Sequence, residues 1–116
     1  MPIREATVEQ LDEARRASDG TGAPRILDVR TEGEHAIASL SGALLIPLHE
    51  LNGRVGELAE EGWGHDDPVF VLCHHGVRSR TGAAILQGMG FQNVASVTGG
   101  IEAWSLRVDP AVPRYS

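Results

Sequence analysis

The fold is decided by residues 68–79, which read Pro68-Val69-Phe70-Val71-Leu72-Cys73-His74-His75-Gly76-Val77-Arg78-Ser79 and hold the only cysteine of the chain. The apolar run before Cys73 is rich in β-branched and aromatic side chains, which predicts a short buried strand. Residues 81–89 carry apolar side chains at helical spacing, so we expect a helix there. A strand that turns sharply into a helix leaves backbone N–H groups and the positive end of the helix dipole facing the loop between them. We therefore expect the sulfur of Cys73 to be favoured as the thiolate, its nucleophilic form, and not to serve as a packing residue.

The flanking sequence alternates strands with helices. Besides residues 68–72, we expect strands at residues 25–30, 43–46 and 94–97. We expect one helix from a capping box at Thr7 to about Ser18, a short helix from a second capping box at Thr31, one helix through residues 48–58, and a last one from residue 99 through Trp104. Residues 19–22 and 62–68 are predicted turns. This alternation predicts a single α/β domain over residues 1–116 with a mostly parallel sheet.

Composition limits the classes of function. The chain has 116 residues, of which 41% are hydrophobic, as expected for a globular protein. Ten basic against sixteen acidic residues give a net charge of −6, which argues against non-specific binding to nucleic acid or to anionic membranes. A single cysteine cannot form an internal disulfide bond, and we find neither a signal-peptide core nor a stretch of membrane-spanning length. We therefore expect a soluble cytoplasmic protein.

Glycines gather where the predicted strands end. Gly76, Gly99 and Gly100 all follow strands, and ligands of parallel α/β sheets bind at the edge where strands turn into helices. We therefore expect Cys73 to meet Gly99 and Gly100 at one edge of the sheet. The alternative is that these glycines only permit tight turns.

Three blocks of sequence, in order and at the expected spacing, resemble the rhodanese family of sulfurtransferases in its single-domain form. They are Asp28-Val29-Arg30, Glu34-His35, Gly42-Ala43 and Ile46-Pro47 in the first block, the loop 73–79 in the second, and Val97-Thr98-Gly99-Gly100-Ile101-Glu102-Ala103-Trp104 in the third. The chain departs from the family at Ser39-Leu40-Ser41, where members commonly carry a Gly-His pair. The tail, residues 108–115, is similar to tails of some bacterial members, and no role follows for it. The resemblance implies a three-layer rhodanese-like domain with about five strands in a central, mostly parallel sheet flanked by helices.

The resemblance also implies a thiosulfate sulfurtransferase activity without a cofactor. Cys73 would take the outer sulfur of a donor such as thiosulfate as a persulfide, and a thiol or cyanide would then remove it. The loop amides would hold the thiolate and the persulfide; they belong to His74, His75, Gly76, Val77, Arg78 and Ser79. Because the chain has one cysteine, the acceptor thiol must come from another molecule, small or protein.

The side chains around Cys73 have alternative roles. Arg78 either contacts the oxygens of the donor or braces the loop by pairing with a carboxylate such as Asp28. Asp28 and Arg30 are interpreted as mainly structural, and together with Gly99 and Gly100 they would support the loop.

His74 and His75 either lend charge to the site, with a dependence on pH, or only supply backbone with their rings turned to solvent. A metal site is not expected. His35, His49 and His65 lack ligand-like spacing, and Cys73, His74 and His75 should splay in different directions around a tight loop.

Three other functions remain to be compared. A cysteine phosphatase or arsenate reductase needs five residues between its cysteine and its arginine, whereas four separate Cys73 from Arg78 and Ser79 occupies the required position. Such a loop suits a sulfur atom better than a phosphoryl group. A non-catalytic binding or regulatory module of this fold usually lacks the cysteine. A persulfide carrier needs the same loop as an enzyme, so this alternative stays open.

Overall fold

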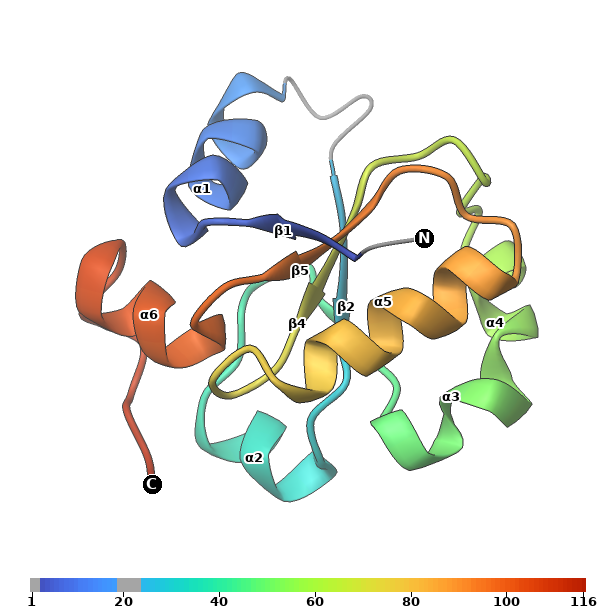
Figure 1. Ribbon diagram of the computed structural model, residues 1–116. Helices are drawn as coiled ribbons and strands as arrows, with labels where there is room; N and C mark the ends of the chain where they lie inside the picture. The colour runs from blue at the N-terminus through green and yellow to red at the C-terminus, as the bar shows by residue number, and fades with distance from the viewer. Residues whose placement is uncertain (1–2, 19–23) are drawn as a thin grey trace.

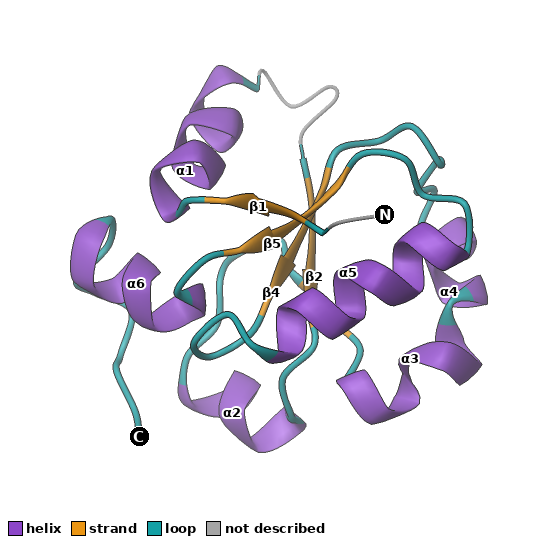
Figure 2. Ribbon diagram, in the orientation of Figure 1, coloured by secondary structure: helices purple, strands orange, loops and turns teal. Residues whose placement is uncertain are grey.

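The computed structural model describes residues 3–18 and 24–116, and the turn expected at residues 19–22 lies outside them. Five parallel strands form one sheet in the order β1-β5-β4-β2-β3 (Figures 1 and 2). The strands are β1 (Arg4–Ala6), β2 (Arg25–Asp28), β3 (Leu44–Leu45), β4 (Val69–Leu72) and β5 (Val94–Val97). The prediction of an α/β fold with a parallel sheet of about five strands is confirmed.

Helices cover both faces of the sheet, as Figure 1 shows. Helices α1 (Val8–Ala17) and α6 (Gly100–Arg107) lie on one face, and α3 (Leu48–Arg54), α4 (Gly56–Glu60) and α5 (Arg78–Gly88) lie on the other. Successive strand residues point to opposite faces, so β4 contributes Val69 and Val71 to one core and Phe70 and Leu72 to the other. This central strand is buried along its whole length, which is why its sequence is continuously apolar.

Local signals predicted the helix starts well. Both capping boxes are present: Thr7 and Gln10 begin α1, and Thr31 and Glu34 begin α2 (Glu32–Ile37). The helix expected at residues 81–89 begins earlier, at Arg78. The helix expected through residues 48–58 is instead two helices that meet at Val55.

The predicted ends of the strands were less accurate. The strand expected at residues 25–30 ends at Asp28, and the one expected at 43–46 is only two residues long. Strand β1 was not expected, since two of its three residues are exposed. Among the helices described, none is long and apolar enough to span a membrane.

Candidate active site

Cys73 lies where β4 ends, at the base of a loop that leads into α5. The Gly76 amide donates a hydrogen bond to Cys73 Sγ over 3.0 Å, and the Cys73 thiol donates to Ser79 Oγ over 3.4 Å. Ser79 Oγ in turn lies 2.7 Å from Ser96 Oγ on β5. In the part of the chain that the structure describes, no side chain caps the start of α5, so the positive end of this helix faces the loop uncovered.

The Cys73 side chain is almost fully buried, with 1% of its surface exposed. It packs within the core on the α5 side of the sheet while its sulfur contacts the loop. Among the residues described, Gly76 is the one loop residue whose amide donates to Sγ, so the expected ring of amides around the sulfur is not seen. The loop above it is accessible, because His75 and Val77 are exposed. The sulfur is therefore buried in the core on the α5 side of the sheet and touches the loop through the Gly76 amide.

Glycines on both sides let the start of α6 approach this loop closely, and a Cβ placed on Gly76 of the loop would lie 2.9 Å from the amide nitrogen of Gly99. Gly100 has φ +58°, and a Cβ placed on it would lie 2.5 Å from the carbonyl oxygen of His74. The amides of Ile101 and Glu102 donate to the carbonyls of Cys73 and His74 over 2.8 and 3.1 Å. The expected meeting of Cys73 with Gly99 and Gly100 at one sheet edge is therefore confirmed.

Arg78 braces the loop through an ion pair. Its guanidinium donates to both oxygens of Glu34 over 2.6 and 2.7 Å, so its partner is Glu34 and the suggested Asp28 is wrong. The hydrogen bonds from Arg78 hold the pKa of Glu34 well below its usual range. The same bonds raise the pKa of Arg78, with a smaller contribution from the nearby charge of Cys73. The Arg78 guanidinium is therefore near enough to interact electrostatically with the sulfur of Cys73, and its charge is balanced by Glu34.

Asp28 and Arg30 form a fully buried ion pair beneath α2. Arg30 Nη2 lies 2.6 Å from Asp28 Oδ2, and neither side chain is exposed. Arg30 also donates to the carbonyl of Ala38 over 2.6 Å, while His35 Nδ1 lies 3.0 Å from Asp28 Oδ2. Burial opposes the charge of Arg30, but its bonds to Asp28 and Tyr115 outweigh this effect and raise its pKa. The pair ties β2 to α2, which carries Glu34.

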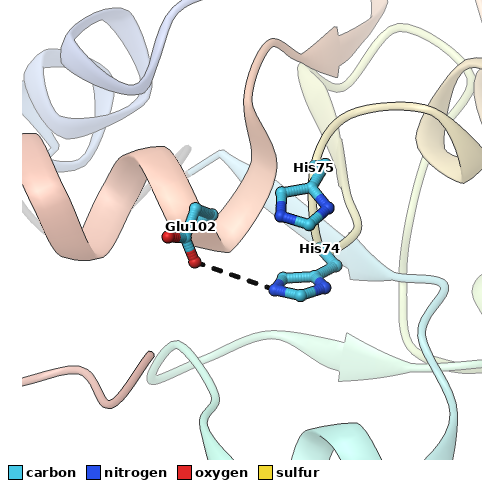
Figure 3. Close-up of side chains that lie close together, drawn as sticks. All are labelled: His74, His75 and Glu102. Atoms are coloured by element: carbon cyan, nitrogen blue, oxygen red, sulfur yellow. Dashed lines mark ion pairs between the residues drawn. The ribbon is translucent and has the colours of Figure 1, made fainter. Parts of the chain in front are cut away.

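The His74 ring lies in a stack of three. Its centroid is 3.8 Å from that of His75 and 3.9 Å from that of Tyr115. Figure 3 shows the His74 ring beside His75 and Glu102, with His74 Nε2 lying 3.7 Å from Glu102 Oε2. The expectation that His74 and His75 splay apart is wrong, and so is the alternative that the His74 ring turns to solvent, because Tyr115 and Glu102 cover it. The ring of His75 follows the alternative of rings turned to solvent, since His75 is exposed.

In the described part of the chain, one ligand atom from each of His74, His75 and Glu102 lies within 4.8 Å of the others, so these three residues could hold a metal ion. The two imidazole rings are stacked with planes only 25° apart, so lone pairs lying in those planes do not meet at a point close to both rings. Arg114 pairs with Glu102 through Oε1 over 2.6 Å, and Oε2 of Glu102 faces His74. Coordination bonds of about 2.0–2.1 Å to zinc would require the rings to turn.

Sequence reasoning missed Tyr115 as a site residue. Its hydroxyl donates to Glu34 Oε2 over 2.7 Å and accepts from Arg30 Nη1 over 3.0 Å. The similarity of residues 108–115 to tails of family members was a signal, but it carried no mechanism. Ser96 was also missed, although a serine inside a short apolar strand is itself a signal.

Comparisons with known proteins show the family to which this chain belongs. The family model of the rhodanese-like domain matches residues 8–107. The thiosulfate sulfurtransferase GlpE of Actinobacillus succinogenes is 39% identical over 79 residues, which cover 68% of this chain and 67% of GlpE. The Rhodanese-like/PpiC domain-containing protein 12 of Arabidopsis thaliana is 35% identical over 98% of this chain.

Several of these relatives are longer proteins. The chain spans 38% of the Arabidopsis protein just described, and 22% and 49% of two further curated relatives. Among solved structures, a rhodanese-like domain protein from Staphylococcus aureus has a TM-score of 0.77 at 24% identity, covering 98% of this chain and all of that one. That likeness shows the fold. The match over residues 8–107 and the identity to GlpE show the family: the chain belongs to the rhodanese-like domain family, which includes sulfurtransferases.

Proposed function

We propose that this chain transfers a sulfane sulfur from a small donor such as thiosulfate to an acceptor thiol, through a persulfide on Cys73. The observation that carries the proposal is the position of Cys73 Sγ, 3.0 Å from the Gly76 amide and next to the uncapped start of α5. Backbone amides and helix N-termini bind anions, and the sulfur is an anion both as the attacking thiolate and as the persulfide. The similarity to GlpE, a thiosulfate sulfurtransferase, supports thiosulfate as the donor.

The reaction has two steps that balance in atoms and electrons. In the first, the Cys73 thiolate attacks the outer sulfur of thiosulfate, the S–S bond of the donor breaks, and sulfite leaves with the electron pair. In the second, an acceptor thiolate or cyanide attacks the terminal sulfur, and the Cys73 thiolate leaves. This is nucleophilic catalysis through a covalent intermediate, so ping-pong kinetics are expected.

The short loop favours transfer of a single sulfur atom over transfer of a larger group. Only four residues separate Cys73 from Arg78, and the Cys73 side chain is 1% exposed, so a donor must reach it with a single terminal atom. Arg78 is held by both oxygens of Glu34, which favours bracing of the loop over direct contact with the donor. His75 and Val77 form the exposed rim that the donor and the acceptor would meet.

The acceptor is an external thiol, because the chain offers no second cysteine to resolve the persulfide. A reaction that begins from a free thiolate needs a reducing compartment, and the cytoplasm is one. The donor is tested by comparing sulfur loading from thiosulfate with loading from a cysteine desulfurase. Faster loading from thiosulfate supports the enzymatic function, whereas loading only from the desulfurase indicates a persulfide carrier.

The nucleophile is tested with Cys73→Ser, assayed for thiocyanate formation from thiosulfate and cyanide. We expect turnover to be lost while the circular dichroism spectrum is kept. Ala95→Ser is a matched control, because it buries a hydroxyl on the neighbouring strand β5 and leaves the thiol intact. Turnover by Cys73→Ser at the rate of the unmodified chain would refute the assignment.

A further inference from the structure

The segment after α6 returns to the candidate site. Figure 1 shows it running from α6 toward α2. Val108, Val112 and Tyr115 pack against the core on the α1 and α6 side, and Ser105 Oγ donates to the carbonyl of Val112 over 2.6 Å. Arg114 pairs with Glu102 over 2.6 Å. These contacts fix the segment, so the position of Tyr115 beside the loop is determined by packing and by hydrogen bonds.

The ring of Tyr115 contacts the first residue of the loop after Cys73. It stacks on His74 with a centroid separation of 3.9 Å and planes 11° apart. The Glu102 amide donates a hydrogen bond to the carbonyl of His74 over 3.1 Å. His74 is therefore fixed through both its ring and its backbone, directly next to the sulfur-bearing residue.

The hydroxyl of Tyr115 acts on the other end of the same loop. It donates to Glu34 Oε2 over 2.7 Å, and Glu34 holds Arg78, the first residue of α5. It accepts from Arg30 Nη1 over 3.0 Å, which connects it to the buried ion pair with Asp28. Desolvation raises the pKa of Tyr115, so the phenol stays protonated and able to donate at neutral pH.

We propose that Tyr115 is a positioning residue for sulfur transfer, which holds both ends of the Cys73 loop, one with its ring and the other with its hydroxyl. This inference rests on the proposed function of Cys73. The physical reason is that a small displacement of a nucleophile from the groups that stabilise it lowers the rate of reaction. Tyr115 acts through His74 and Glu34, and not on the sulfur directly.

Two substitutions separate the two contacts. Tyr115→Phe keeps the stack on His74 and removes the hydroxyl, and a lost bond to a charged group predicts a persulfide-forming rate about tenfold lower at saturating thiosulfate. Tyr115→Leu removes both contacts and should lower the rate by roughly a further tenfold. Asp109→Ala is the control: it removes only the bond from the Ala111 amide to Asp109 Oδ1, in the same segment, and should leave the rate unchanged.

A double-mutant cycle distinguishes positioning from a general loss of stability. If Tyr115 acts through Glu34, adding Tyr115→Phe to Glu34→Ala should change the rate by less than about twofold. Multiplicative effects of the two substitutions, or a Tyr115→Phe variant as fast as the unmodified chain, would overturn the inference.

The rate of alkylation of Cys73 by iodoacetamide provides a readout that does not depend on sulfur transfer. Because Cys73 is buried, loosening of the loop in Tyr115→Leu should raise this rate several-fold, whereas Asp109→Ala should not. An unchanged alkylation rate in Tyr115→Leu contradicts the positioning role. Absence of any persulfide in the unmodified chain overturns the proposed function alone, and alkylation still decides whether Tyr115 holds the loop.

Discussion

Gly100 offers a direct test of how the Cys73 loop is held, because a single methyl group there would meet the loop backbone. Gly100 has φ +58°, and an added Cβ would lie 2.5 Å from the His74 carbonyl oxygen and 2.7 Å from its carbon. It would also press on the carbonyl oxygen of Cys73. These are backbone atoms, which cannot rotate away as a flexible side chain would, so either α6 or the loop has to shift in Gly100→Ala.

The structure provides a matched control for the backbone conformation alone. Gly42 also has a positive φ, +84°, but a Cβ on it would meet nothing within 4 Å. The left-handed conformation costs an alanine about 1–2 kcal/mol in both variants. Crowding in Gly100→Ala adds roughly 1–3 kcal/mol, as overpacking does elsewhere. The difference in unfolding free energy between the two variants should therefore be roughly 1–3 kcal/mol.

Urea unfolding measures this difference through tryptophan fluorescence, since Trp63 and Trp104 are both buried. Sulfur transfer should respond more strongly, because relief of the crowding moves the carbonyls of Cys73 and His74, which accept the amides of Ile101 and Glu102. We expect Gly42→Ala to keep near-normal turnover and Gly100→Ala to lose most of it. Equal stability and equal turnover of the two variants would refute the argument that α6 clamps the loop.

Two further predictions concern the length and the bracing of the loop. Insertion of one glycine between His75 and Gly76 should abolish sulfur transfer, because it displaces the Gly76 amide from Sγ. The urea midpoint should change little, since Arg78 can remain paired with Glu34. Unchanged kinetics would show that loop length does not select for sulfur. For Glu34, the pKa is held below its ordinary value of 4.5 by Arg78, so its contribution to stability is complete above that value and is lost as the pH falls toward its folded pKa. The difference in unfolding free energy between the unmodified chain and Glu34→Gln should therefore be constant near neutral pH and shrink in acid. A difference that does not depend on pH would contradict a stabilising role for the ion pair between Glu34 and Arg78.

Much of the fold could be predicted because its determinants are local. The capping boxes at Thr7 and Thr31 each depend on residues three positions apart, and both were placed correctly. The strand before Cys73 was predicted because a central parallel strand is buried on both faces and is therefore apolar throughout. Strand β1 gave no such signal, since it lies at the sheet edge and only Ala6 is buried.

The contacts that hold the site could not be predicted, because they join residues that lie far apart in the sequence. Glu34 and Tyr115 are 81 positions apart, and Arg78 lies 44 positions from Glu34, so no spacing rule relates them. Asp28 was a reasonable partner for Arg78 by charge, but Arg30, two residues from Asp28, already satisfies that carboxylate. The stack of His74 on Tyr115 likewise depends on where residues 108–115 return, which is a property of the tertiary fold.

The mass of the intact chain after treatment with thiosulfate tests the central claim most directly. The proposed mechanism predicts one added sulfur atom on the unmodified chain, lost on addition of cyanide or a reductant, and no addition to Cys73→Ser. An unmodified chain that gains no sulfur under these conditions, or a Cys73→Ser variant that still gains it, would contradict the assignment of Cys73 as the sulfur carrier.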